Sequence, residues 1–243
     1  MTPADADQPT RRLRWGVVVF PGTNCEYDTE HVLGSVLGQE VRRVWHRETD
    51  LADLDAVVLP GGFAHGDYLR SGAIARFSPV MESVAGFAAA GRPVLGICNG
   101  FQVLLEAGLL PGAMLPNRSR RFSCRWVHLR VESSHSPFLA ACRPGRLLHM
   151  PMAHGEGCYY VEDGELQEME RRGQVVLRYA AADGSVSDAV NPNGSRENIA
   201  GVCNATGNVL GLMPHPERAA EAILGSDDGR LLLEGLLRQG TAA

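Results

Sequence analysis

Short apolar runs alternate with helical patterns over the first half of the chain, and this alternation constrains the fold more than any other feature. The apolar runs, rich in β-branched residues, occupy residues 13–20, 41–45, 56–60 and 93–97. The helical patterns cover residues 25–38, residues 78–91 and the stretch from Asn99 onward. Strands that alternate with helices form right-handed βαβ units and a parallel sheet. We therefore expect an α/β fold in which helices flank a mostly parallel open sheet.

The pattern changes after about residue 112, where turn residues separate a series of short strands. These expected strands are residues 125–131, 147–152, 158–161, 174–180, 198–204 and 209–214. We expect them to form an antiparallel β extension, followed by one or two helices over residues 217–240. The polar residues 1–12 are expected to form a disordered or poorly ordered tail, and residues 13–240 a single domain.

The chain contains no lysine, because all 23 basic residues among its 243 are arginines. This excludes a Walker A phosphate loop, a Schiff-base lysine and a lysine general base. The net charge of −5 gives no reason to expect a nucleic-acid partner.

The six cysteines lie too far apart in sequence to form zinc-type pairs, so we expect no metal site. The chain is also too long to need a disulfide framework. Its opening segment has no apolar core of a signal peptide, and no apolar run approaches the ~18 residues of a membrane span. We therefore expect a reduced, cytoplasmic protein without membrane contact.

The segment Gly96-Ile97-Cys98-Asn99-Gly100 places a cysteine where the fourth strand turns into a helix. Ligands of open α/β sheets bind at the carboxyl ends of the strands. A strand–turn–helix elbow lifts its central side chain above the sheet, and the flanking glycines relieve crowding around it. The first turn of the helix favours the thiolate form. A buried structural cysteine is the alternative, and the paired glycines make a nucleophile an equally good interpretation.

The segment His215-Pro216-Glu217 follows another apolar run and supplies the second candidate. Prolines 214 and 216 favour an extended backbone, in which residues two apart point to the same side. A carboxylate beside an imidazole fixes its tautomer and stabilises its protonated form. Alone, this segment is more often an inert turn.

Together, Cys98, His215 and Glu217 supply a nucleophile, a base and an orienting carboxylate. Gly61 and Gly62 follow the strand at 56–60 and can offer backbone N–H groups to an oxyanion in the same crevice.

With these motifs the sequence resembles the class I (triad) glutamine amidotransferases, whose fold is flavodoxin-like. The segments VVFPGTNCEYD, LPGGFAHGDYLRSGAIA, MAHGEGCYY and GLMPHPER extend the resemblance. The glycine-rich loop and the AHGEG segment resemble in particular the glutaminase subunits (subunit I) of phosphoribosylformylglycinamidine synthases. The resemblance spans roughly residues 14–235, nearly the whole chain.

The resemblance implies that Cys98 attacks the side-chain carboxamide of L-glutamine, while His215, oriented by Glu217, transfers the protons. A glutamyl thioester forms and is hydrolysed to glutamate, and ammonia is released. The other implied site residues are Gly62 and Asn99 for the oxyanion hole, and Gln102, His154, Gly155 and Glu156 for glutamine binding.

The resemblance also implies partners. Ammonia would pass to a large synthetase subunit that converts formylglycinamide ribonucleotide to formylglycinamidine ribonucleotide in purine (IMP) biosynthesis, with a small third subunit bridging the two. ATP and Mg²⁺ would be used by the synthetase, and this chain would bind no cofactor. Two other functions stay open: a stand-alone hydrolase of the same superfamily, and a non-catalytic binding module with Cys98 as a redox sensor. The second does not require His215 and Glu217, so their presence argues against it.

Three further features have two interpretations each. The arginine-rich segment 117–126 is either a solvated loop or a surface that meets the synthetase or its anionic substrate. Cys25 follows the first strand and could line the same crevice, but we expect a structural role. His65 and Asp67 have the spacing of a dyad, but we prefer a loop near a partner interface.

Overall fold

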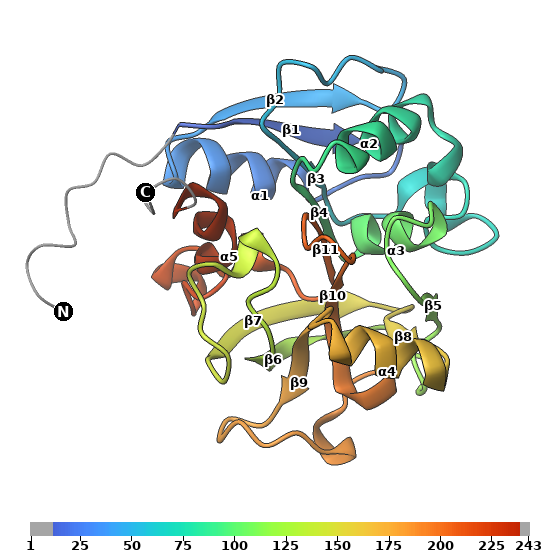
Figure 1. Cartoon of the computed structure of the whole chain (residues 1–243), viewed down its shortest axis with the longest axis vertical. Coiled ribbons are helices and arrows are strands. Elements are labelled where there is room, and N and C mark those ends of the chain that lie inside the picture. The colour runs from blue at the N-terminus through green and yellow to red at the C-terminus, as the bar shows by residue number, and fades with distance from the viewer. Residues whose placement is uncertain (1–11, 239–243) are drawn as a thin grey trace, which may run out of the picture.

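The computed structural model describes residues 12–238 (Figure 1). Apart from Arg12, the tail expected over residues 1–12 lies outside the described residues, as do residues 239–240 of the expected domain. One sheet of nine strands runs through the molecule in the order β2-β1-β3-β4-β11-β10-β9-β6-β7.

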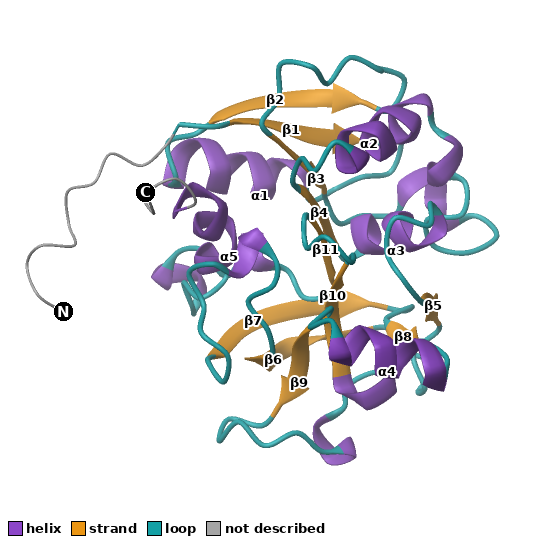
Figure 2. Ribbon diagram, viewed as in Figure 1, coloured by secondary structure: helices purple, strands orange, loops and turns teal. Residues whose placement is uncertain are grey.

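The first five strands in this order are parallel to one another. They are β2 (Glu40–Trp45), β1 (Arg14–Val19), β3 (Ala56–Leu59), β4 (Val94–Ile97) and β11 (Val209–Leu212). Figure 2 shows α2 (Pro79–Ala89) and α3 (Asn99–Glu106) on one side of these strands, with α1 (Glu26–Glu30) and α5 (Arg230–Gly235) on the other. The expected α/β fold with a flanked, mostly parallel sheet is confirmed.

The other four strands continue the same sheet in antiparallel fashion. They are β10 (Ile199–Cys203), β9 (Val175–Ala180), β6 (Ser123–Val131) and β7 (Leu147–His154). A separate antiparallel pair joins β5 (Ala113–Leu115) to β8 (Cys158–Tyr160). The expected antiparallel extension is therefore present, mostly as a continuation of the main sheet.

Strand β11 differs from the expectation, because its sequence lies among the strands of the second half. It pairs in parallel with β4, from Val209 opposite Val94 to Leu212 opposite Ile97. This register carries the segment after β11 to the same sheet edge as Cys98.

Several local expectations were wrong. The helix expected over 25–38 is α1 followed by a π-helical segment at His31–Val36. Helix α4 (Asp163–Arg171) was missed because its sequence is polar and only Leu166 and Met169 are buried. Before α5, the expected C-terminal helix is replaced by short 3₁₀ turns at Pro216–Arg218 and Ala222–Leu224.

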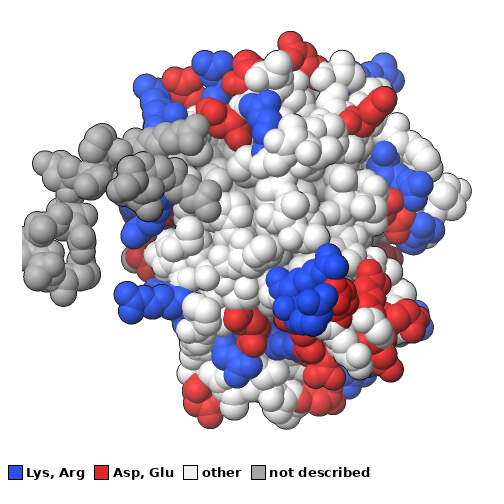
Figure 3. All heavy atoms as spheres, viewed as in Figure 1, with Lys and Arg blue, Asp and Glu red and all other residues white. Residues whose placement is uncertain are grey.

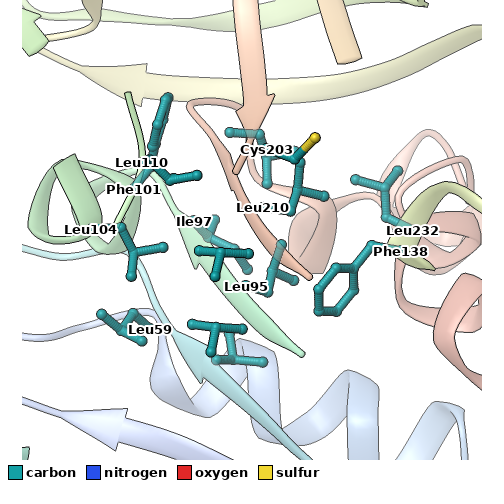
Figure 4. Close-up of a cluster of buried hydrophobic side chains, with 14 of the residues drawn as sticks. Leu59, Leu95, Ile97, Phe101, Leu104, Leu110, Phe138, Cys203, Leu210 and Leu232 are labelled. Atoms are coloured by element: carbon teal, nitrogen blue, oxygen red, sulfur yellow. The ribbon is translucent and has the colours of Figure 1, made fainter. Parts of the chain in front are cut away.

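Buried apolar side chains fix α3 against the centre of the sheet, as Figure 4 shows around Leu95, Ile97 and Phe101. The ring of Phe101 packs where Gly211 of β11 has no side chain: a Cβ there would lie 2.1 Å from the ring. The glycine lets the helix approach the strand closely, so α3 is held firmly behind the turn at Cys98.

On the face drawn in Figure 3, charged residues of both signs are interspersed, mainly toward the edges, and a broad central area carries neither. This face thus presents no continuous basic surface of the kind that binds nucleic acid. Within residues 12–238, no helix has the length and apolar character needed to cross a bilayer.

Candidate active site

Cys98 occupies a strained turn between β4 and α3. Its backbone angles are φ 49° and ψ −105°, a conformation that non-glycine residues rarely adopt. Such strain costs about 1–3 kcal/mol and persists only where the surroundings impose it. Here the backbone N–H of Cys98 donates to the carbonyl of Leu212 at 2.8 Å, which ties the turn to β11.

Both glycines that flank this turn are required sterically. A Cβ on Gly100 would lie 1.9 Å from the carbonyl oxygen of Leu59, and a Cβ on Gly96 would lie 2.5 Å from a methyl carbon of Leu104. Helix α3 can therefore start close against β3 and β4 only with glycine at these positions. The elbow expected from the sequence is present.

The side chain of Cys98 is buried, with its sulfur 3.6 Å from the carbonyl oxygen of Ala153 on β7. It stands directly before the first turn of α3, whose N–H groups and dipole favour a negative charge there. The thiolate is the nucleophilic form of cysteine, so this position suits a nucleophile.

His215 and Glu217 meet as expected, but through a different backbone geometry. Nδ1 of His215 lies 2.6 Å from Oε1 of Glu217, and both residues are only 2% exposed. His215 is extended, but Pro216–Arg218 forms a 3₁₀ turn, so the extended backbone expected through residue 217 was wrong. The turn folds the Glu217 carboxylate back toward the imidazole ring. The backbone N–H of His215 donates to the backbone carbonyl of Pro151.

The electrostatics of His215 suit a proton carrier. Burial alone lowers its pKa, but the carboxylate of Glu217 and the sulfurs of Cys98 and Cys25 outweigh this and raise the pKa well above its usual value. Because Glu217 engages Nδ1, the proton to be exchanged belongs to Nε2. That atom is buried and has no hydrogen-bond partner in the described residues.

Cys98 and His215 open into one cavity of about 390 Å³. Of the nine predicted site residues, seven line it: Gly62, Cys98, Gln102, His154, Gly155, Glu156 and His215. The two others lie behind the wall, where Glu217 supports His215 and Asn99 begins α3. The sequence therefore predicted seven of the fifteen residues that line this cavity.

Side-chain amides hold the part of the cavity wall around Gln102. Asn99 Nδ2 donates to Asp67 Oδ1 and to Gln102 Oε1, both at 2.9 Å. Gln102 Nε2 donates in turn to the carbonyl of Glu156 at 2.5 Å. Because both ends of the Gln102 amide are engaged, its contribution in this structure is to hold the wall rather than to offer a free hydrogen-bonding group.

His154 is buried in the same wall, and its Nδ1 lies 3.1 Å from the side-chain oxygen of Asn117. Burial, reinforced by the positive charge of His215, lowers the pKa of His154 to about 4. His154 is therefore neutral near pH 7 and does not compete with His215 for protons.

Sequence reasoning missed several lining residues, among them Asn24, Ser71, Phe122 and Arg218. Cys25 lines the cavity, as its position after the first strand allowed, and its sulfur lies 3.2 Å from the Arg218 guanidinium. Its expected structural role stays a prediction.

His65 and Asp67 turn in different directions rather than forming a dyad, and the expected place of this loop near a partner interface stays a prediction. His65 turns to Ser78, with Nε2 3.3 Å from the hydroxyl, and its ring packs edge-on against His46. Asp67 turns instead into the cavity.

One group in the described residues has donor atoms placed as a metal site would need them: Cys25, His215 and Glu217, all within 4.8 Å. These are Zn²⁺-type ligands. However, Glu217 is already hydrogen-bonded to His215. The Arg218 guanidinium donates a hydrogen bond to the sulfur of Cys25, and its positive charge would repel a metal ion. The expectation of no metal stays a prediction.

Comparison with known proteins agrees with this geometry. The family model of the CobB/CobQ-like glutamine amidotransferase domain matches residues 12–228. The chain belongs to this family. A phosphoribosylformylglycinamidine synthase subunit PurQ from Salinibacter ruber is 56% identical over 92% of this chain and 95% of that protein. The subunit of the same name from Moorella thermoacetica is 54% identical over 93% of this chain and 95% of its own length.

Among solved structures of amidotransferases and their complexes, a chain of PurLQS from Thermotoga maritima superposes with a TM-score of 0.83 and 42% identity. The match covers 93% of this chain and 98% of that chain. A glutamine amidotransferase from Thermotoga maritima, at 16% identity and a TM-score of 0.59, shares the fold. The resemblance to amidotransferases of the phosphoribosylformylglycinamidine synthase type is thereby confirmed.

Proposed function

We propose that this chain is the glutaminase subunit of a phosphoribosylformylglycinamidine synthase. It hydrolyses L-glutamine and passes ammonia to a synthetase that converts formylglycinamide ribonucleotide to formylglycinamidine ribonucleotide in purine biosynthesis. One observation carries the proposal: the strained Cys98 elbow shares a cavity with the buried His215–Glu217 pair, in a chain more than half identical to subunits of that name.

The geometry supports a two-stage reaction. In the first stage the Cys98 thiolate attacks the carboxamide carbon, a C–S bond forms, and the carbonyl oxygen takes the negative charge. The backbone N–H groups of Gly62 and Asn99 would stabilise this oxyanion. The C–N bond then breaks as protonated His215 gives its Nε2 proton to the leaving nitrogen, which departs as ammonia and leaves a glutamyl thioester.

In the second stage His215 removes a proton from water, and the resulting hydroxide attacks the thioester carbon. The C–S bond breaks, glutamate leaves, and the sulfur returns to the thiolate form with the proton on His215. Glu217 stays ionised throughout and stabilises the imidazolium.

The chain has no lysine and hence no Walker A loop with which to activate an acceptor by phosphorylation. The proposal therefore assigns ATP and Mg²⁺ to a large synthetase subunit and includes a small subunit that bridges the two. The cytoplasmic location expected from the cysteine content belongs to the same proposal.

The test is glutamine-dependent synthesis by the assembled complex with His215→Ala and with Glu217→Gln. We expect His215→Ala to abolish it, because the proposed reaction draws the proton for the leaving nitrogen from Nε2 of His215. Glu217→Gln should be less severe, since it removes the charge but keeps a group that orients the ring.

Added ammonium should restore synthesis in both variants. Failure of ammonium to restore it would mean that the substitutions act on folding or assembly. Full glutaminase activity of the isolated wild-type chain, without any partner, would favour the stand-alone hydrolase instead.

A further inference from the structure

A pair of histidines outside the lining of the catalytic cavity, His46 and His65, takes no part in the proposed chemistry. His46 is buried directly after β2, and His65 belongs to the glycine-rich loop 61–73. Their rings meet edge-on, with centroids 5.3 Å apart. The hydroxyl of Ser78 contacts both, 3.2 Å from Nδ1 of His46 and 3.3 Å from Nε2 of His65. One hydroxyl therefore joins two imidazoles from distant segments of the chain.

The hydroxyl of Ser78 is not used as a serine hydroxyl at this position usually is. Ser78 is buried and directly precedes α2, where a serine commonly accepts a hydrogen bond from the first helical turn. Here the side chain makes no such bond. A hydroxyl has one proton to donate and lone pairs with which to accept, so it can donate to one imidazole nitrogen and accept an N–H from the other. The two histidines thus replace the helix as its partners.

The loop that carries His65 has a strained backbone that contacts must maintain. His65, Asp67 and Leu69 have φ angles of 55°, 51° and 73°, in the left-handed region that non-glycine residues rarely adopt. Such a backbone persists only where the surrounding structure imposes it. His65 supplies two restraints, because its backbone N–H donates to the carbonyl of Pro21 at 2.6 Å and its ring contacts Ser78. The His65 side chain therefore helps to keep the loop in this conformation.

The groups that face His46 disfavour a positive charge on its ring. Trp45 packs edge-on against it with centroids 4.7 Å apart, and the ring of Phe20 lies 6.5 Å away. Burial, the positive charge of His65 and that of Arg47 together lower the pKa of His46. His46 therefore takes up a proton less readily when His65 already carries one.

The groups that face His65 offer no acidic side chain to offset a second proton. Its ring lies 6.3 Å from Phe20 and against His46. The groove beside it is lined by Pro21, Gly22, Phe63, Gly66, Tyr68 and Ile74. A proton on both imidazoles would set two positive charges around the Ser78 hydroxyl, whose own proton would then have no acceptor in either ring. The arrangement is therefore stable with at most one proton shared by the two rings.

From this arrangement we infer that Ser78 and His46 are positioning residues that hold the glycine-rich loop through His65, and that this hold is released when both imidazoles are protonated. The inference rests on the proposed function in one respect, because the loop also carries Gly62, whose N–H is assigned to the oxyanion. Gly62 lies three residues before His65, so a displaced loop would move that N–H away from the charge it stabilises.

The first test needs no activity and uses the full chain. His65→Asn keeps a residue that tolerates the left-handed region, but its shorter side chain ends before the position of Nε2. In an NMR titration of the imidazole resonances, this change should raise the midpoint of His46, because the two sites are coupled. Hydrogen–deuterium exchange near pH 7 should be faster over residues 61–73 in His65→Asn and in Ser78→Ala than in wild type.

The second test measures glutamine hydrolysis in the assembled complex. Both variants should lower kcat about tenfold or more with KM little changed, because a misplaced oxyanion donor weakens an interaction made in the transition state. The ratio of wild-type to variant kcat should be largest near pH 7 and shrink toward one as pH falls, since wild type then loses the same contact. Titration of the catalytic residues affects both proteins and cancels in this ratio.

Ser83→Ala is the matched control, since the Ser83 hydroxyl, also on α2, donates to the carbonyl of Thr49 at 2.7 Å. It should match wild type in every measurement. A kcat ratio that does not vary with pH, or a His46 midpoint unaffected by His65→Asn, would overturn the inference. Coupled titration and faster exchange in a protein that does not hydrolyse glutamine would support the hold on the loop and contradict the proposed function.

Discussion

At the scale of single residues, two buried thiols line one cavity but differ in their surroundings. Each thiol stands before the first turn of a helix, Cys98 before α3 and Cys25 before α1. Cys25 also lies against Arg218, and its sulfur is 3.1 Å from the side-chain oxygen of Asn24. Both interact with His215. The strained elbow distinguishes Cys98, because such strain is retained where it positions a reacting atom.

A glutamine analogue with a diazoketone in place of the amide should therefore label Cys98 alone. Peptide mapping by mass spectrometry checks this. Cys25→Ser should be labelled like wild type, while Cys98→Ser should not be labelled. Modification found on Cys25 in the wild type would contradict the assignment of the nucleophile.

His154 gives a pH prediction at the same scale. The unfolded chain takes up a proton on this residue below about pH 6.5, but the folded protein resists it until pH falls to about 4. Stability contributed by neutral His154 is therefore present above pH 6.5 and is lost as pH falls toward 4, by at most about 3 kcal/mol.

Urea unfolding at pH 7 and pH 5 measures this effect. His154→Gln should be less stable than wild type at pH 7 and should lose less further stability on acidification. An equal acid-induced loss in both proteins would show that other groups control it, with His46 and His149, whose pKa values burial also lowers, the first to examine.

At the scale of elements, the approach of α3 to the sheet decides whether the elbow exists. Gly100→Ala would place a Cβ 1.9 Å from the carbonyl oxygen of Leu59, so the helix must move away from β3. We expect a loss of several kcal/mol in unfolding free energy, as for other overpacked cores, and loss of glutaminase activity.

Gly86→Ala is the matched control. Gly86 lies within α2, and a Cβ there would meet nothing within 4 Å. This change should stabilise the protein by up to about 1 kcal/mol and leave activity intact. Thermal unfolding and glutamate release measure both variants, and a harmless Gly100→Ala would refute the steric account of the elbow.

At the scale of the whole molecule, the glycine-rich loop joins the cavity to the outer surface. Asp67 faces the cavity, while Tyr68 and Leu69 next to it are 71% and 80% exposed. A partner that contacts these side chains can therefore shift the loop that carries Gly62 and Asp67. A glutaminase that is idle until its synthetase docks would avoid wasting substrate.

We expect the isolated chain to hydrolyse glutamine slowly and the synthetase, with nucleotide and acceptor, to raise the rate about tenfold or more. A triple variant that combines Arg118→Ala, Arg120→Ala and Arg121→Ala should be stimulated less by the synthetase. Its basal rate of glutamine hydrolysis should be unchanged. Within residues 12–238 the Arg118 side chain pairs with exposed Asp188, so little stability should be lost. The measurement is the steady-state rate of glutamate release with and without the synthetase. If the triple variant is stimulated as strongly as wild type, segment 117–126 is better interpreted as a solvated loop.

The sequence by itself determined β1 to β4, four of the five parallel strands, and the candidate residues at their edge. Continuous apolar runs and the glycines around Cys98 are local signals, and the structure places β1 to β4 within one or two residues of the expected bounds. His215 and Glu217 are two residues apart, so their contact needed only a turn. Motif spacing could therefore point to a candidate nucleophile and base without knowledge of the fold.

Only the tertiary structure decided how distant segments meet. The insertion of β11 beside β4 brings His215 to Cys98, and this depends on pairing between residues more than 100 positions apart. Cys25, Asp67 and Arg218 enter the cavity for the same reason, because each lies at the sheet edge on a different segment. Local periodicity carries no information about such pairings, whereas burial of the whole sheet selects one arrangement.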